Sequence, residues 1–127
     1  AQVHRDVRKV CHALPNTIVT THMSHSYPQG ANLNFIFITK MSDADEFKAY
    51  HTTILDAIQK SGAAISHHHG IGKMFAPWLE GYIGRREYEV FRVLKNHFDP
   101  DYMMNPGGTI GLDLPESEKK FLCDRGE

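Results

Sequence analysis

The sequence has few cysteines, no excess of either charge and no long apolar run, and each shortage excludes a class of protein. Only two cysteines, Cys11 and Cys123, occur in 127 residues. They can pair, but we expect a reduced, cytoplasmic protein rather than a disulfide-rich secreted one. Lysine and arginine total 14 against 15 acidic residues, which predicts no nucleic-acid or anionic-lipid partner. No apolar run approaches the about 20 residues of a membrane span.

Histidine, by contrast, is abundant, with nine residues in the chain. Three of them, His67, His68 and His69, are consecutive, and Gly70 and Lys73 follow closely. Three adjacent imidazoles inside a chain are not a purification tag. Imidazoles clustered at a glycine turn favour proton transfer, anion binding or metal binding.

The hydrophobic pattern predicts three helical and three extended segments. Helical spacing of apolar residues covers 3–14, 42–61 and the stretch from Pro77 towards Asp99. β-branched and apolar runs predict strands over 18–24, 33–39 and 63–66. Ser42 is the predicted N-cap of the second helix and Gly62 its end, while residues 27–30 form a turn.

Together these elements predict an α+β fold with helices packed on an antiparallel sheet. Both faces of 33–39 are apolar, which indicates a central strand covered on each side. The order resembles part of a ferredoxin-like arrangement without its opening strand, followed by a C-terminal helix and the loop 105–108. We expect one domain over 1–114 and a charged tail over 115–127. The chain begins in mid-helix without methionine, so we expect a piece of a longer polypeptide.

The predicted strand 63–66 determines how the histidines are expected to point. Neighbouring strand residues face opposite sides, so His67 and His69 share one face and His68 takes the other. A straight strand of this kind does not bring all three imidazoles to one metal ion. If a metal is bound, the expected ligands are His22, His25 and His68, provided that they converge in space. Otherwise His22 and His25 are surface histidines by default. The candidates for substrate binding are His25, Asn34 and Lys73.

Polar and glycine-rich positions supply the remaining candidates. Asn34 interrupts an otherwise apolar strand face, so its amide needs a partner, which is either neighbouring backbone or a ligand. Gly70 permits close approach of a planar ligand, and Lys73 suits an anion. The loop that contains Asn105 and Gly107 is a turn signal whose glycines can offer backbone N–H groups to a cofactor. We expect the aromatic residues of the helices to be core.

The run Gly62–Lys73 (GAAISHHHGIGK) resembles the C-terminal domain of FAD-linked oxidases of the vanillyl-alcohol oxidase superfamily. Further features agree over residues 15–112, namely the segments 30–34, 76–79, 98–100 and 105–107. The triple histidine is most similar to alkyldihydroxyacetonephosphate synthases and their bacterial relatives.

The resemblance implies that FAD is bound mainly by a separate N-terminal domain, which is the expected partner of this chain. The present domain would cover the flavin, bind a small or lipid-like substrate and be inactive alone. In such synthases, an acyl chain is exchanged for a fatty alcohol through a flavin adduct, without net redox change. His68 and His69 would transfer protons and bind the polar part of the substrate, with His67 nearby. Asn105 and Gly107 would approach the flavin.

Two positions depart from the pattern that the resemblance implies. Asn34 stands where the synthases carry a catalytic tyrosine and where related 2-hydroxy-acid dehydrogenases carry a metal-binding histidine. His68 replaces a metal-binding glutamate of those dehydrogenases. Asparagine serves neither as a general acid nor as a good zinc-type ligand. A flavin-dependent dehydrogenase of a 2-hydroxy acid or alcohol is therefore an alternative function.

A free-standing module that binds a metal or an anion is an alternative of another class. If the chain is instead a cap for a flavin domain, it should expose an apolar face where that domain packs. We then expect self-association, for example as a homodimer, or marginal stability.

Overall fold

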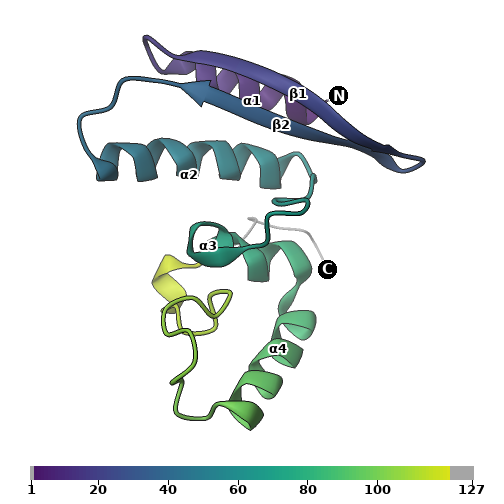
Figure 1. The fold of residues 1–127 in the computed structure, drawn as a ribbon, viewed down its shortest axis with the longest axis vertical. Coiled ribbons are helices and arrows are strands. Elements are labelled where there is room, and N and C mark those ends of the chain that lie inside the picture. The colour runs from purple at the N-terminus through teal and green to yellow at the C-terminus, as the bar shows by residue number, and fades with distance from the viewer. Residues whose placement is uncertain (1, 121–127) are drawn as a thin grey trace. The chain divides into compact units, whose positions relative to one another are not determined.

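The computed structural model describes residues 2–120, which fall into two compact units. The first unit is Ala1–Ala63 and the second begins at Ala64 (Figure 1). The described part contains four α-helices and one two-stranded antiparallel sheet, so the predicted mixed α+β class is confirmed. None of the helices in this part is long and apolar enough to cross a membrane.

The first unit is a helix, a β-hairpin and a second helix. Helix α1 spans Gln2–Ala13, strands β1 and β2 span Ile18–Tyr27 and Gly30–Ile38, and helix α2 spans Ala44–Lys60. The helix 3–14 and the turn at 27–30 are thus close to prediction. The strands pair from Ile18 opposite Ile38 to Tyr27 opposite Gly30.

The core of this unit lies between the two helices and one face of the hairpin. Val7 and Cys11 of α1 are completely buried, and Tyr50 donates a hydrogen bond to the Cys11 carbonyl. Removing apolar surface from water is the main stabilising contribution here. The buried cluster is completed by Val19 and Ile54, with Val3, Val10, Leu14, Phe35, Phe37, Met41, Ala57 and Ile58 packed around it. A pairing of Cys11 with Cys123 involves a residue outside the described range.

The predicted N-cap Ser42 is wrong by one residue. Asp43 caps α2, because its carboxylate accepts hydrogen bonds from the backbone N–H groups of Asp45 and Glu46, at 2.9 and 2.8 Å. Glu46 in turn accepts from the Ser42 backbone N–H at 2.7 Å. The arrangement resembles a capping box but is not one, because Glu46 accepts from the residue before the N-cap and not from the N-cap itself. Gly62, with φ +75°, follows the helix end as predicted.

The prediction that strand 33–39 is central and covered on both faces is also wrong. One face packs in the core through Phe35 and Phe37, whereas Ile36 and Ile38 on the other face are 55% and 68% exposed. Within the described residues, the sheet has no strand besides β1 and β2. The apolar pattern was therefore misleading, because it does not distinguish a covered face from an exposed one.

The second unit contains helix α3 (Gly72–Ile83), helix α4 (Arg85–Phe98) and a short 3₁₀ helix η1 (Glu116–Glu118). Helix α3 begins before Pro77, which lies inside it rather than at its start as predicted. Gly84, with φ +96°, separates α3 from α4. A side chain rarely adopts this backbone conformation, so glycine allows the chain to change direction here.

The predicted third strand, 63–66, is not a strand in the structure. These residues lie in an irregular segment, and Ile65 is its one buried large apolar side chain. A strand needs a partner for its backbone groups, and the paired strands of the described chain are β1 and β2 alone. The faces predicted for the histidines that follow are therefore not set by strand alternation.

Helix α4 carries an apolar stripe that faces solvent. We use the name α4 stripe for Val90, Phe91, Leu94 and Phe98, which are all exposed. The prediction that these aromatic residues belong to the core is wrong for Phe91 and Phe98, although Tyr88 on the same helix is fully buried. An apolar stripe of this kind is the exposed face expected of a domain that packs against a partner.

Residues 115–120 contain one buried lysine that holds them to α3. Lys119 pairs with Glu80 of α3 at 2.8 Å and with Glu116 at 2.5 Å. Its ammonium also lies 5.2 Å from the centre of the Tyr88 ring. The side chains of Lys119 and Glu80 are only 2% and 7% exposed, so the two charges compensate each other away from water.

Candidate functional site

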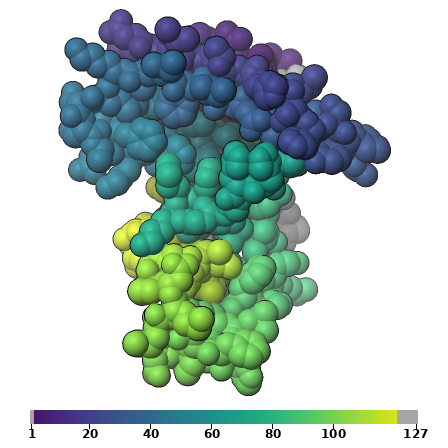
Figure 2. Space-filling view, in the orientation of Figure 1, coloured from purple at the N-terminus to yellow at the C-terminus, as the bar shows by residue number. Residues whose placement is uncertain are grey.

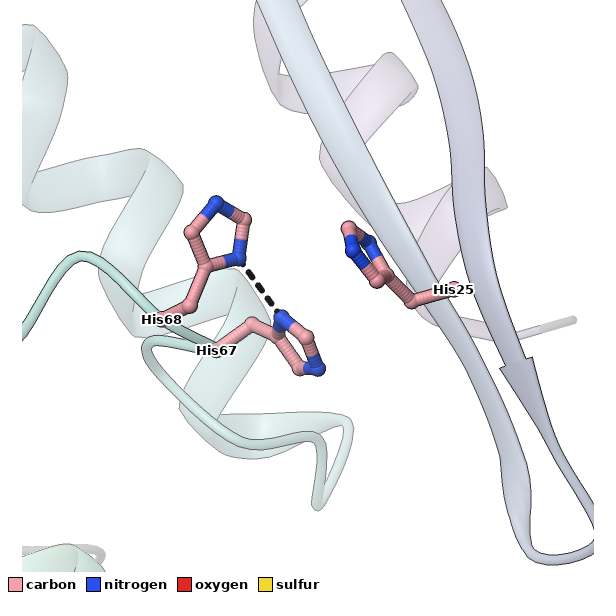
Figure 3. Close-up of side chains that lie close together, drawn as sticks. All are labelled: His25, His67 and His68. Carbon is pink, nitrogen blue, oxygen red and sulfur yellow. Dashed lines mark hydrogen bonds between the residues drawn. The ribbon is translucent and has the colours of Figure 1, made fainter.

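The three consecutive histidines lie on an exposed irregular segment just before α3. The Nδ1 atoms of His67 and His68 are 2.7 Å apart, as the dashed line in Figure 3 shows. The rings of His68 and His69 have centres 4.2 Å apart. His68 thus contacts both neighbours, and the predicted separation of His68 from His67 and His69 is wrong.

The contact between His67 and His68 limits their protonation. A hydrogen bond between two imidazole nitrogens needs one donor and one acceptor. At least one of the two rings is therefore neutral while the bond exists, and the pair holds one shared hydrogen between its Nδ1 atoms. Such a pair is suited to pass a proton between a substrate and solvent.

In the first unit, a polar cluster lies on the exposed face of the hairpin. We call Ser24, His25, Asn32 and Asn34 the hairpin cluster. The Ser24 hydroxyl lies 3.1 Å from Asn32 Nδ2, 3.0 Å from Asn34 Nδ2 and 3.1 Å from His25 Nδ1. Asn32 Nδ2 also donates to Asn34 Oδ1 at 3.3 Å. The Asn34 amide thus has side-chain partners, whereas the sequence left neighbouring backbone and a ligand as the two alternatives.

The predicted metal ligands belong to different units. His22 and His25 lie on β1 in the first unit, with His22 opposite Asn34, while His68 lies in the second unit. Their convergence stays a prediction. Within either unit taken alone, the described residues bring no three His, Cys, Asp or Glu side chains together at metal-binding distance.

The loop after α4 is held by two aspartates that the sequence analysis did not select. Asp99 accepts the backbone N–H groups of Met103 and Met104, at 2.8 and 2.9 Å, and a hydrogen bond from Lys95. Asp113 accepts the Gly107 N–H at 2.6 Å. Figure 2 shows this loop, in light green, at the surface of the second unit. The only available sequence signal was the presence of acidic residues on each side of a glycine turn.

Lys73 lies against the same loop. A Cβ atom added to Gly107 would lie 3.5 Å from Lys73 Nζ, so the ammonium sits beside the glycine. Gly70, with φ +77°, has open space where its Cβ would be. Two predicted substrate or cofactor positions of the second unit, Lys73 and Gly107, are therefore brought together.

The backbone N–H groups of the loop 105–108 that the sequence offered to a cofactor have partners within residues 99–113. The Gly107 N–H already donates to Asp113, and the Gly108 N–H donates to the Asn105 carbonyl at 3.0 Å. The Asn105 side chain in turn donates to the Gly108 carbonyl. The backbone donors predicted for a cofactor are thus used inside the loop. The open surface at Gly70 fits one wall of a planar ligand better than an enclosing pocket.

We expect the loop 99–113 to open in acid. A hydrogen bond from Lys95 lowers the pKa of Asp99, and a hydrogen bond from Thr109 lowers the pKa of Asp113. Because both folded-state values lie below the unfolded ones, the carboxylates stabilise the loop fully above about pH 4, and this contribution is lost as pH falls through the folded-state values. Loop opening should increase about tenfold per pH unit across that interval for each carboxylate.

Hydrogen exchange at the Met103, Met104 and Gly107 amides, corrected for intrinsic rates, measures this opening. The variants Asp99→Asn and Asp113→Asn should each remove part of the pH dependence. Asp101→Asn changes an exposed carboxylate of the same loop and serves as the control. Protection that is constant from neutral pH down to about pH 2 would show that the aspartates do not hold the loop.

The family described as "FAD linked oxidases, C-terminal domain" matches residues 1–109. Alkyldihydroxyacetonephosphate synthase of Dictyostelium discoideum is 36% identical over 110 residues, which are 84% of this chain and 18% of that protein. The uncharacterized FAD-linked oxidoreductase YgcU of Escherichia coli (strain K12) is 33% identical over 103 residues, covering 76% and 21%.

Glycolate oxidase subunit GlcD of Bacillus subtilis (strain 168) is 28% identical over 97 residues, covering 74% of this chain and 20% of that subunit. The chain thus spans about a fifth of the length of these curated relatives. No solved structure matches it significantly.

Proposed function

Since the chain belongs to the family of FAD-linked oxidase C-terminal domains, we propose that it is the substrate-side domain of a flavoenzyme resembling alkyldihydroxyacetonephosphate synthase. The reaction would exchange the acyl chain of acyl-dihydroxyacetone phosphate for a fatty alcohol. The observation that carries the proposal is the exposed run His67–His69, with His67 and His68 sharing a hydrogen. The 36% identity to the Dictyostelium discoideum synthase supports it.

In this proposal the histidines and the lysine of the second unit act on the polar end of the substrate. His68 and His69 take up and return the protons of the alcohol, and His67 holds the hydrogen that His68 shares. Lys73 lies in the first turn of α3, whose start has no side-chain cap. An ammonium at the positive end of a helix suits a phosphate group. Asn34 contributes hydrogen bonds but no proton transfer.

FAD is the proposed cofactor, bound mainly by another domain, and when bound it supplies the reactive ring on which the exchange takes place. The open surface at Gly70 would lie beside the flavin ring. The α4 stripe is the face that we propose for contact with the FAD-binding domain, because an apolar face of this kind is normally covered by a partner. The reduced, cytoplasmic state and the partial ferredoxin-like architecture remain part of the proposal.

Oxidation of a 2-hydroxy acid or alcohol is the second candidate, and Asn34 is the observation that favours it. The synthase chemistry implied by the resemblance needs a tyrosine at this position, and an amide has no ionisable proton to replace it. The similarity to the Bacillus subtilis glycolate oxidase subunit is compatible with this candidate.

Product analysis of the flavoenzyme that contains this domain separates the two candidates. The enzyme would be given acyl-dihydroxyacetone phosphate and a fatty alcohol, or a 2-hydroxy acid and an artificial electron acceptor. An ether-linked product with release of fatty acid supports the first proposal, whereas reduction of the acceptor alone would replace it by the second. The isolated 127-residue chain serves as the control and should neither turn over nor change the visible spectrum of added FAD.

Replacement of His69 by alanine in that flavoenzyme should reduce kcat by about 10²–10⁴-fold, the usual contribution of a general acid or base. His69 is exposed, so the variant should remain folded. His12→Ala removes another exposed imidazole, at the end of α1, and is the matched control. Full activity of the His69 variant would exclude its role in proton transfer.

A further inference from the structure

We propose that Ser24 is a positioning residue that fixes the His25 ring in the tautomer with hydrogen on Nε2. The inference concerns the hairpin cluster of Ser24, His25, Asn32 and Asn34. The tautomer itself does not depend on the proposed function, but its consequence for recognition rests on that function and on the substrate-binding role predicted for His25 and Asn34. Ser24 is half-buried at the centre of this cluster, and three side chains lie within 3.1 Å of its hydroxyl oxygen.

The orientation of the two amides follows from their mutual contact. Asn32 and Asn34 approach each other through Asn32 Nδ2 and Asn34 Oδ1, a donor and an acceptor. Turning either amide alone would bring two donors or two acceptors together. Turning both would place two carbonyl oxygens against the Ser24 hydroxyl, which has only one hydrogen to donate. The arrangement in which both Nδ2 groups donate to Ser24 satisfies every contact.

The numbers of lone pairs and hydrogens on the Ser24 hydroxyl also determine the direction of its hydrogen bond with His25. A serine hydroxyl has two lone pairs and one hydrogen. The amides of Asn32 and Asn34 occupy both lone pairs, so the remaining contact, at 3.1 Å, uses the hydroxyl hydrogen. His25 Nδ1 must then be the acceptor, and a neutral imidazole that accepts at Nδ1 carries its hydrogen on Nε2.

The backbone supports this arrangement. The strand register is regular from Ile18 to Ser24 and resumes at Ser26, so His25 is the extra residue of a β-bulge. His25 has φ +51°, a left-handed conformation that is uncommon for a residue other than glycine. Bulges redirect single side chains, and strained conformations persist where the surroundings hold them. The bulge therefore brings the His25 ring to the hydroxyl of the residue before it.

The tautomer defines what His25 can recognise. A hydrogen on Nε2 makes this atom a donor, so its partner in a substrate is an acceptor such as a phosphate, carboxylate or carbonyl oxygen. A metal ion at Nε2 would require the hydrogen to move to Nδ1. The hydrogen on Nδ1 would then point at the Ser24 hydroxyl oxygen, whose two lone pairs already accept from Asn32 and Asn34. The hairpin cluster therefore favours an oxygen-bearing ligand over a metal at His25.

The tautomer is measured directly by ¹⁵N NMR of the imidazole rings in the 127-residue chain. The wild-type spectrum should show His25 with hydrogen on Nε2, and Ser24→Ala should shift the ring to a mixture of tautomers. Ser24→Thr retains a hydroxyl and should restore the wild-type pattern. Ser26→Ala removes an exposed hydroxyl from the other side of the bulge and should change nothing.

A wild-type His25 ring with hydrogen on Nδ1 would overturn the proposal, and so would an unchanged tautomer in Ser24→Ala. The wild-type measurement decides the matter even if a variant fails to fold. In the flavoenzyme, Ser24→Ala should raise KM about three- to tenfold, as expected for one neutral hydrogen bond, with less change in kcat. A fixed tautomer with an unchanged KM would leave the role of Ser24 intact and contradict substrate binding at His25.

Discussion

Replacement of Lys119 by methionine is expected to lower the free energy of unfolding by about 3–5 kcal/mol, because it leaves the Glu80 carboxylate buried without its counter-charge. The pair is 2.8 Å apart, and the Lys119 side chain is only 2% exposed. Methionine has similar length, so the loss of packing against Tyr88 should be small. Urea denaturation of the 127-residue chain measures the effect.

A double variant tests whether the uncompensated charge is the cause. Glu80→Gln combined with Lys119→Met removes both charges and should recover most of the lost stability. Lys120→Met changes the exposed neighbouring lysine and should stay within about 0.5 kcal/mol of wild type. If Lys119→Met is as mild as Lys120→Met, the ion pair does not stabilise the second unit.

Replacement of Ile54 by alanine should lower the free energy of unfolding by about 2–5 kcal/mol, the second largest effect on stability that we expect. Ile54 is 5% exposed and belongs to the buried cluster with Val7, Cys11 and Tyr50. Its truncation removes apolar contacts and leaves a cavity between α2 and the elements that pack on it.

Ile54→Val is the graded control for this site and should cost about 0.5–1.5 kcal/mol, since only one methylene is removed. Both variants are measured by thermal and urea unfolding under the same conditions. Equal losses for alanine and valine would show that the surrounding side chains close the cavity, and the cluster would then be less rigid than its burial suggests.

Local patterns in the sequence predicted most helices and the hairpin, but not which faces are covered. The periodic apolar residues of α1 and α2 pack in the core as expected. Ile36 and Phe91 have the same apolar character, yet both are exposed. Burial depends on which elements pack together, and a local pattern contains no information on a partner that is distant in the chain or belongs to another domain.

The candidate site was predicted in composition but not in geometry. The structure brings His68 into contact with His67 and His69 and Lys73 beside Gly107, and the roles predicted for these residues stay predictions. The strand predicted before the histidines does not exist. A three-residue apolar run is ambiguous, because periodicity cannot distinguish a short strand from an irregular buried segment. The contact of Lys73 with the glycine loop joins positions 34 residues apart in the chain, which only the tertiary fold reveals.

The residues that were not predicted differ in whether the sequence contains a signal for them. Glu80 was detectable in principle, because it is an acid within an apolar helix and needs a partner. Lys119 gave no signal, since it lies among other charged residues. Ser24 became recognisable only with the hairpin register, which places it opposite Asn32.

The bulge at His25 also has an evolutionary consequence. Ser24 and Ser26 pair with the adjacent residues Asn32 and Ala31, so loss of the single codon for His25 would leave a regular ladder. Loss of one codon elsewhere in β1 would turn part of the strand over and expose its core-facing side chains. The hairpin fold therefore tolerates the gain or loss of one residue at this point, and alignments of related hairpins that lack an equivalent of His25 should place their gap there.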